Sequence, residues 1–238
     1  MEQVTTEKDR MNHESEIPRN ARKWRTRISN LIATLLPFAT SIPPLAAWGA
    51  LMAIPLIGYI ALLFTSGPAH FLEALLLLFF GGFVWEMVIA VIGLSILVYS
   101  FVHMRLARKE GLITSGPYRF VRHPQYLGVV LFTLTLTTRS YWIATNTFGM
   151  SWIAPDLMLA IWIGMLLAYI VLATVEELHL AKTFASVFEQ YKQKTGFLLP
   201  YVRSGRREVE IALSLLLPVI LLYTLVFVSN LIMFPPLL

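Results

Sequence analysis

Residues 111–128, GLITSGPYRFVRHPQYLG, form a polar, turn-rich segment in a chain that is otherwise strongly apolar. Arg122 and His123 directly precede Pro124 in this segment. Because proline suits the first position of a helix and keeps the preceding residue out of helical geometry, we expect a helix to begin at Pro124. A helix start carries unpaired N–H groups and a partial positive charge, which Arg122 and His123 would reinforce. The segment is therefore predicted to bind an anionic group of a ligand.

Glu176 and Glu177 form a second charged group, at the expected end of a later apolar helix. Two adjacent carboxylates near lipid favour a cationic partner, either a ligand ammonium or a nearby arginine. Aromatic side chains accompany both groups, namely Tyr118, Tyr126, Phe184 and Tyr191. A zwitterionic ligand with a flat ring would suit this combination of opposite charges and aromatic rings.

The composition is that of a helical membrane protein. Of 238 residues, 57% are hydrophobic and 14% are charged, whereas about 25% are charged in a soluble domain. We predict an all-α, polytopic helical membrane protein with about five transmembrane helices, and up to seven. One apolar run is too long for a single upright helix, so either Gly81-Gly82 splits it or one long helix is tilted. The candidate spans are 45–64, 71–103, 125–138, 155–175 and 211–233.

Positive charges indicate the orientation in the membrane. Lysines and arginines cluster in 19–27, 105–122 and 182–207. Since positive residues near span ends mark the cytoplasmic side, the N-terminus and the active site are predicted to be cytoplasmic. Contact with anionic lipid headgroups explains these clusters better than nucleic-acid binding. Arg139 stands alone between apolar segments and is expected to mark the opposite face.

A single helical face follows the Glu pair. Its members are Leu180, Phe184, Val187, Phe188 and Tyr191. Their i, i+4, i+7, i+8, i+11 spacing predicts an amphipathic helix that begins after the preceding span, and that lies on the membrane or covers a site. The chain is accordingly divided into a cytoplasmic N-terminal tail (1–30), N-terminal transmembrane helices (31–103), a core with the loop and the amphipathic helix (104–207) and a C-terminal transmembrane helix (208–238).

Glu86 is an acid deep within an apolar run, without an evident charged partner. We expect it to be a protonated, hydrogen-bonded contact between helices; a pore-facing residue of a transporter is the alternative. The histidines show no metal-ligand spacing, so a metal site is not expected.

The 111–128 segment, the Glu pair and the later F-x-x-x-F-x-x-Y spacing ending near L-L-P together resemble the isoprenylcysteine carboxyl methyltransferase family, in a wider group of membrane phospholipid and thiol methyltransferases. The resemblance covers about residues 103–201. It implies S-adenosyl-L-methionine as cofactor and a lipophilic or small apolar methyl acceptor. The G-x-G-x-G loop of soluble methyltransferases does not occur in the sequence.

The resemblance also implies residue roles. Glu176 would take the cofactor's amino group, and Glu177 and Arg122 are the candidate catalytic residues. Leu172 replaces an arginine that faces the acceptor in isoprenylcysteine-methylating relatives, so a carboxylate, a thiol and an amine all remain acceptors, with isoprenylcysteine-type carboxyl methylation the leading candidate. The implied cofactor-binding residues are His103, Glu110, Gly111, Leu112, Ile113, Gly116, Tyr118, His123, Pro124, Gln125, Tyr126 and Glu176.

Two other functions fit parts of the sequence. A sterol-reductase-like enzyme would bind NADPH at a comparable place. A transporter or membrane interaction protein would explain Glu86, Asp156 and the basic clusters without a cofactor.

Overall fold

A computed structural model describes most of the chain after residue 43. The predicted tail 1–30 and Glu110 lie outside the described residues. The chain divides into two compact units, Met1–Leu51 and Met52–Leu238, and the contacts reported below are those of the second unit. The described residues are 44–65, 68–107, 111–146, 153–202, 204 and 206–232, with side chains described from Leu51 on, except 66–70.

The described elements are helices, joined by short connections. No β-strand occurs within these ranges; they contain one isolated bridge between the loop before α6 and the segment after α7. The all-α prediction is confirmed. The elements are α3 (Pro44–Thr65), α4 (Pro68–Leu76), the π-helix η1 (Leu77–Gly81), α5 (Val84–Leu106), the 3-10 helix η3 (Gly116–Arg119), α6 (Pro124–Asn146), α7 (Pro155–Lys194) and α8 (Arg207–Ile232).

The helices α5, α6, α7 and α8 are long and apolar enough to cross a membrane. Each of the five predicted crossings contains a helix, and the first corresponds to α3, which has 22 residues. Within α3, the part with described side chains is a shorter apolar helix. The long run 71–103 is divided at Gly82 and Phe83, between η1 and α5. Of the two alternatives, a split at Gly81-Gly82 or one long tilted helix, the structure has the split.

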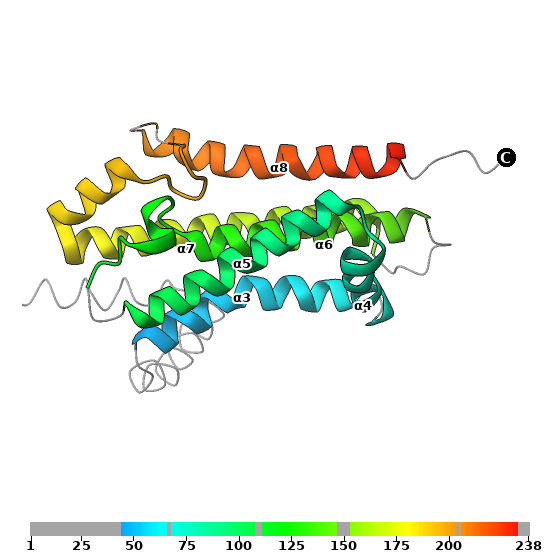
Figure 1. The fold of residues 1–238 in the computed structure, drawn as a ribbon, viewed down its shortest axis with the longest axis horizontal. Helices are drawn as coiled ribbons and strands as arrows, with labels where there is room; N and C mark the ends of the chain where they lie inside the picture. Colours follow the sequence, from blue (N-terminus) through cyan, green and yellow to red (C-terminus); the bar gives the residue numbers. More distant parts are fainter. Residues whose placement is uncertain are drawn as a thin grey trace, which may run out of the picture. The chain divides into compact units, whose positions relative to one another are not determined.

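Helix α6 is the centre of the helical packing, because it contacts α4, α5, α7 and α8. Its most apolar stretch is 72% buried, against 17% for that of α5. A close approach between α5 and α6 depends on Gly93 and Gly128: a Cβ atom on Gly93 would lie 2.7 Å from the backbone nitrogen of Phe132, and one on Gly128 would lie 2.7 Å from the carbonyl oxygen of Gly93. Figure 1 shows α5 to α8 running alongside one another.

The expected placement of Arg139 between helices is wrong. Helix α6 continues to Asn146, so Arg139 lies within it, where its guanidinium forms an ion pair with Glu86 of α5. The hydroxyls of Thr138 and Ser229 each donate a hydrogen bond of 3.1 Å to Oε1 of Glu86. Glu86 thus makes the predicted contact between helices, but with a buried cation as its partner.

Helix α7 consists of two helical segments that meet at a kink, because Ala185 has the non-helical values φ 36° and ψ −112°. A separate helical segment therefore precedes the end of α7 at Lys194 as predicted, but it begins after Ala185 and not directly after the Glu pair. Phe188 and Tyr191 are buried as predicted, whereas Val187 is 57% exposed. Leu180 and Phe184 precede the kink, whereas Val187, Phe188 and Tyr191 follow it, so the five residues do not share one continuous helical face.

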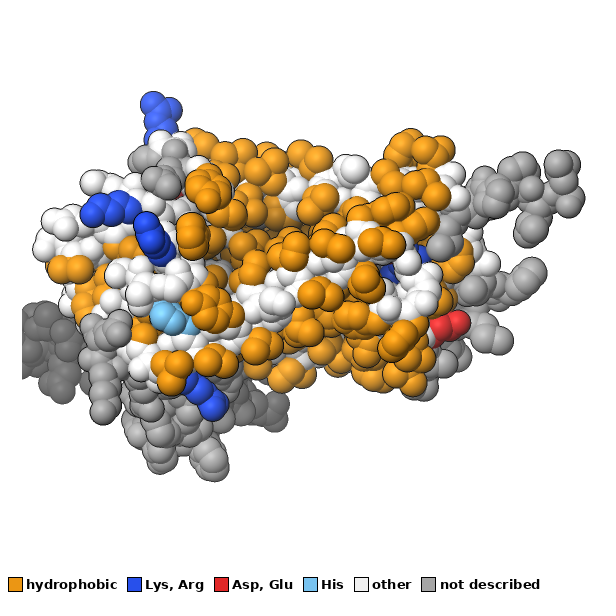
Figure 2. All heavy atoms as spheres, in the orientation of Figure 1, with side chains coloured by type: hydrophobic (Ala, Val, Ile, Leu, Met, Phe, Trp, Pro, Cys, Tyr) orange, Lys and Arg blue, Asp and Glu red, His pale blue; other side chains and the backbone are white. Residues whose placement is uncertain are grey.

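Apolar and basic side chains separate on the surface. Figure 2 shows hydrophobic side chains over the middle of the view and lysines and arginines mainly at its left end. The exposed basic side chains belong to the end of α5, the loop before α6, the second half of α7 and the start of α8, namely Arg105, Arg119, Lys182, Lys194 and Arg206. These elements meet at the end of the bundle that holds the loop, as predicted for the second and third basic clusters.

Candidate cofactor and active site

The loop before α6 is held by the segment that follows α7. Val121 and Gly196 form an isolated parallel bridge. The backbone N–H of Arg122 donates to the carbonyl of Gly196 at 2.9 Å, and the N–H of Gly196 donates to the carbonyl of Phe120 at 3.3 Å. Residues distant in sequence are thereby fixed next to the start of α6.

The first half of the loop turns at two glycines with positive φ, 78° at Gly111 and 60° at Gly116. A Cβ atom on Gly116 would lie 2.7 Å from Nε2 of His103, so the imidazole packs directly against this glycine. The same ring nitrogen lies 3.0 Å from Oγ of Ser115. His103 therefore supports the back of the loop.

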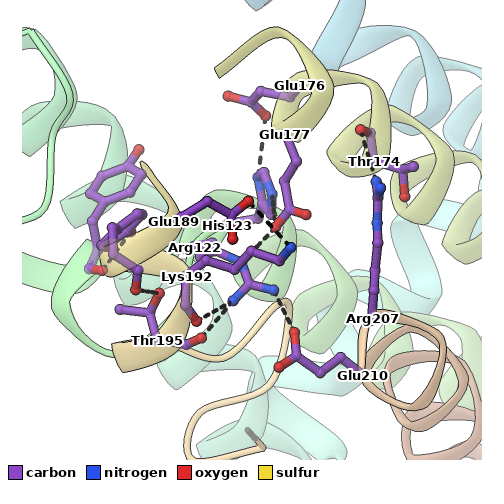
Figure 3. A network of polar contacts seen from close by, with 12 residues as sticks. Arg122, His123, Thr174, Glu176, Glu177, Glu189, Lys192, Thr195, Arg207 and Glu210 are labelled. Atoms are coloured by element: carbon purple, nitrogen blue, oxygen red, sulfur yellow. Dashed lines mark hydrogen bonds and ion pairs between the residues drawn. The ribbon is translucent and has the colours of Figure 1, made fainter. Parts of the chain in front are cut away.

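Arg122 is the centre of a buried polar network (Figure 3). Its Nε donates to Oε1 of Glu177 at 2.5 Å, and its Nη2 donates to Oε2 of Glu210 at 2.5 Å. Its Nη1 donates to the carbonyl oxygens of Lys192 and Thr195, at 3.1 and 2.6 Å. Charge-assisted hydrogen bonds of this kind are stronger than hydrogen bonds between neutral groups. Arg122 thus joins the start of α6 to α7 and α8.

His123 meets the Glu pair beside Arg122. Its Nδ1 lies 3.2 Å from Oε2 of Glu176, and its Nε2 lies 3.7 Å from Oε1 of Glu177. Burial alone would lower the pKa of His123, but the two carboxylates outweigh it and raise this pKa above its usual value. The predicted approach of His123 and Glu176 is confirmed, while their roles in binding stay predictions.

A cavity with about 540 Å³ of empty space, part of it open to solvent, lies between the loop and α7. Its walls come from the end of α5, the loop, and the part of α7 that follows the Glu pair. It is lined by Met104, Gly111, Leu112, Ile113, Tyr118, Arg122, His123, Glu176, Leu180, Phe188 and Tyr191.

Seven of the predicted site residues line this cavity: Gly111, Leu112, Ile113, Tyr118, Arg122, His123 and Glu176. Two other predicted residues, His103 and Gly116 of the loop, pack against each other and do not line the cavity. Pro124, Gln125 and Tyr126 are buried in the first turn of α6. The hydroxyl of Tyr126 donates to Oε2 of Glu176 at 3.3 Å, so this tyrosine reaches the site through Glu176. Glu177 lies behind His123 and is bound to Arg122.

Glu210 is the main site residue that the sequence did not reveal. Acidic residues are common in the first turn of a helix, where they stabilise the helix dipole, so its position in α8 carried no functional signal. Met104 was missed as well, because only its neighbour His103 matched the motif.

The cavity fits the zwitterionic, ring-containing ligand inferred from the sequence. Glu176 offers a carboxylate and the loop offers backbone groups, beside apolar walls from Met104, Leu180 and Phe188. The hydroxyl of Tyr118 is buried and has no hydrogen-bond partner among the described residues, which leaves it available to a ligand. Burial, which is the larger cause, and the negative charge of Glu176 both raise the pKa of Tyr118. The hydroxyl therefore stays protonated. The described residues contain no group of three or more acids and histidines that could hold a metal ion.

Comparisons with known proteins point to one family. No curated protein and no solved structure gives a significant match. Residues 74–155 match the family model described as isoprenylcysteine carboxyl methyltransferase (ICMT). This match spans α5, the loop with Arg122 and His123, and α6. It confirms the resemblance carried by the loop: residues 74–155 of this membrane protein are similar to the ICMT family.

Proposed function

We propose that this protein transfers a methyl group from S-adenosylmethionine to a lipophilic or small apolar acceptor, at the cytoplasmic boundary of the membrane. The observation that carries the proposal is the distance of 3.2 Å between His123 and Glu176 at one cavity, with His123 inside the ICMT-matched segment. When bound, S-adenosylmethionine supplies a methyl group on a sulfonium; transfer breaks the S–CH₃ bond, leaves its electron pair on sulfur, and uses a lone pair of the acceptor for the new bond.

The described side chains suggest how the cofactor would be held. Glu176 would accept hydrogen bonds from its amino group, because this carboxylate lines the cavity and is 22% exposed. The Tyr118 hydroxyl would bond a polar group of the nucleoside part. The apolar walls would exclude water, which strengthens these polar interactions. Positioning of the two reactants would supply much of the acceleration.

The acceptor determines whether the site must also remove a proton. A carboxylate is already ionised near neutral pH and needs no base, whereas a thiol or an ammonium group must first lose a proton. His123 and Glu176 are the ionisable groups at the cavity that lie in contact with each other, and they could receive this proton. Glu177 is engaged with Arg122, which favours a supporting role for it.

Membrane embedding suits an apolar acceptor. Large hydrophobic side chains are exposed along α5, α7 and α8, as expected for helices that face lipid. An acceptor dissolved in the bilayer would approach the cavity from the side, while the water-soluble cofactor would enter from the cytosol.

Calorimetry on the purified protein in detergent tests the proposal. S-adenosylmethionine and its demethylated product should both bind, and the Glu176→Gln variant should bind them about tenfold more weakly, the loss of one charged hydrogen bond. Glu73→Gln is the matched control, because Glu73 is exposed on α4. Absence of binding by the wild-type protein, or NADPH binding in its place, would contradict the proposal.

A further inference from the structure

Among the described residues, the charges of the side chains paired around Arg122 do not balance. Three carboxylates, those of Glu176, Glu177 and Glu210, lie within ion-pair distance of one guanidinium or one imidazole. This group of five side chains, the Arg122 cluster, therefore has one net negative charge when His123 is protonated and two when it is neutral. Such an excess is costly in a buried site unless a ligand compensates it.

Glu210 is the source of the excess charge. Without it, the two remaining carboxylates would match Arg122 and protonated His123. Its Oε2 accepts the 2.5 Å hydrogen bond from Nη2 of Arg122, and its other oxygen lies 3.4 Å from the backbone nitrogen of Ser204. Glu210 is 5% exposed. Figure 3 shows it reaching Arg122 from α8, on the side away from Glu176.

Arg122 has little capacity left for a ligand. Its three nitrogens already donate to two carboxylates and two carbonyl oxygens. Leu172, one turn before Glu176 on α7, is apolar and packs against the hydrophobic core. Among the described residues that line the cavity, Arg122 and His123 are the basic ones, and both are paired with carboxylates.

Two other basic residues near α8 do not change this balance at the cavity. Nη2 of Arg207 donates a hydrogen bond of 3.4 Å to the carbonyl oxygen of Thr174. Nζ of Lys192 lies 3.7 Å from Oε1 of Glu189, with which it forms an ion pair. Neither basic side chain lines the cavity. Arg207 is nonetheless an alternative cation for an anionic acceptor, and it therefore belongs in the test.

We propose that Glu210 is a specificity-determining residue, which occupies Arg122 and keeps the site negative so that it selects an uncharged or cationic acceptor, a thiol or an amine, over a carboxylate. This inference rests on the proposed methyltransferase function. A carboxylate acceptor would add a second net negative charge beside Glu176 and Glu177, where like charges repel more strongly than in bulk water because Glu177 and Glu210 are buried. An amine would compensate the charge of the cluster, and a thiol would leave it unchanged.

Binding of a matched series of dodecyl compounds to the full-length protein in nanodiscs tests the inference. The thiol, the amine and the carboxylate are titrated in the presence of S-adenosylhomocysteine, so that no turnover is needed. We expect the wild-type protein to bind the amine and the thiol at least about tenfold more tightly than the carboxylate. Glu210→Gln should reduce the amine-to-carboxylate preference about tenfold, because it removes one charge. The nanodisc partition of each compound is the same for both proteins and cancels in this comparison.

Glu208→Gln is the matched control, since Glu208 is exposed in the same helical turn, and it should keep the wild-type preference. Carboxylate preference in the wild-type protein would overturn the inference, even if Glu210→Gln failed to fold. An unchanged preference in folded Glu210→Gln would overturn it too, as would loss of all carboxylate binding in Arg207→Ala alone. Failure of S-adenosylhomocysteine to bind the wild-type protein would instead reject the proposed function itself.

Discussion

Glu86 of α5 and Arg139 of α6 form an ion pair inside the membrane-spanning part of the protein, with side chains 0% and 1% exposed. The pair lies roughly 24 Å along α6 from His123, at about 1.5 Å per residue. Because Ser229 of α8 also donates to Glu86, this carboxylate joins three helices at the end remote from the cavity. In lipid each of these charges depends on the other for compensation.

Removing one member of this pair should destabilise the protein severely. Glu86→Gln leaves a buried guanidinium without a counter-charge, so we expect the free energy of unfolding to fall by about 3–5 kcal/mol. The double variant Glu86→Leu, Arg139→Leu removes both charges and should cost less than either single change. Unfolding in detergent, followed by circular dichroism, measures these effects. A double variant as unstable as the sum of the single ones would contradict this account.

His123 should make stability depend on pH. Its pKa is raised in the folded protein by Glu176 and Glu177. A raised pKa adds stability that is fully present below the unfolded-state pKa of about 6.5 and is lost as pH rises through the folded-state pKa. The stability difference between wild type and His123→Asn should therefore be largest near about pH 6 and shrink at higher pH. Unfolding at a series of pH values measures it, and a difference that grows with pH would be the opposite of this expectation.

Local sequence signals predicted much of the fold and part of the site. Pro124 marked the start of α6, and the glycine pair at 81–82 marked the break before α5. His123 was expected to begin one helix and Glu176 to end another at the same face of the membrane, so that the two would meet. They do meet, although Glu176 lies within α7 and not at its end. Such features depend on neighbouring residues or on helix length, and both can be read from the sequence.

Pairings between distant segments could not be predicted in the same way. Arg139 resembled a residue at a membrane boundary, since nothing in its local sequence indicates that Glu86 packs against it. Glu210 looked like an ordinary first-turn acid of α8, although it binds Arg122. The kink at Ala185 likewise had no local signal, because alanine is the residue that most favours a helix.

Arg122 should be essential for the structure of the site. Arg122→Gln leaves Glu177 and Glu210 buried without their cation, and we expect a loss of about 3–5 kcal/mol in unfolding free energy. Arg119→Gln is the matched control, because Arg119 is exposed in the same loop and should change stability by less than about 0.5 kcal/mol. Equal effects of the two changes, measured by unfolding in detergent, would refute the assigned role.

Gly116 should not tolerate a side chain. Gly116→Ala adds a Cβ atom at a positive φ of 60° and directs it at the ring of His103. We expect Gly116→Ala to lower the free energy of unfolding by more than about 1 kcal/mol. Adding His103→Ala to this variant should restore only the part of the loss that is due to the steric clash, because the backbone strain persists. Gly164→Ala is the control in α7, since its Cβ would meet no atom within 4 Å. A double-mutant cycle on unfolding free energy measures the coupling, and zero coupling would contradict the contact.

The hydroxyls of Tyr118 and Tyr191 should have different roles, although both tyrosines line the cavity. The Tyr191 hydroxyl donates to the carbonyl oxygen of Tyr118 at 2.7 Å, so Tyr191→Phe should lower the free energy of unfolding by about 1 kcal/mol. The Tyr118 hydroxyl has no hydrogen-bond partner in the part of the chain that the structure describes, so Tyr118→Phe should leave the free energy of unfolding unchanged or slightly raised. It should weaken S-adenosylhomocysteine binding about fivefold to tenfold, the value of one neutral hydrogen bond. Calorimetry and unfolding of both variants separate the two effects; a Tyr118→Phe protein with wild-type affinity would show that this hydroxyl does not meet the ligand.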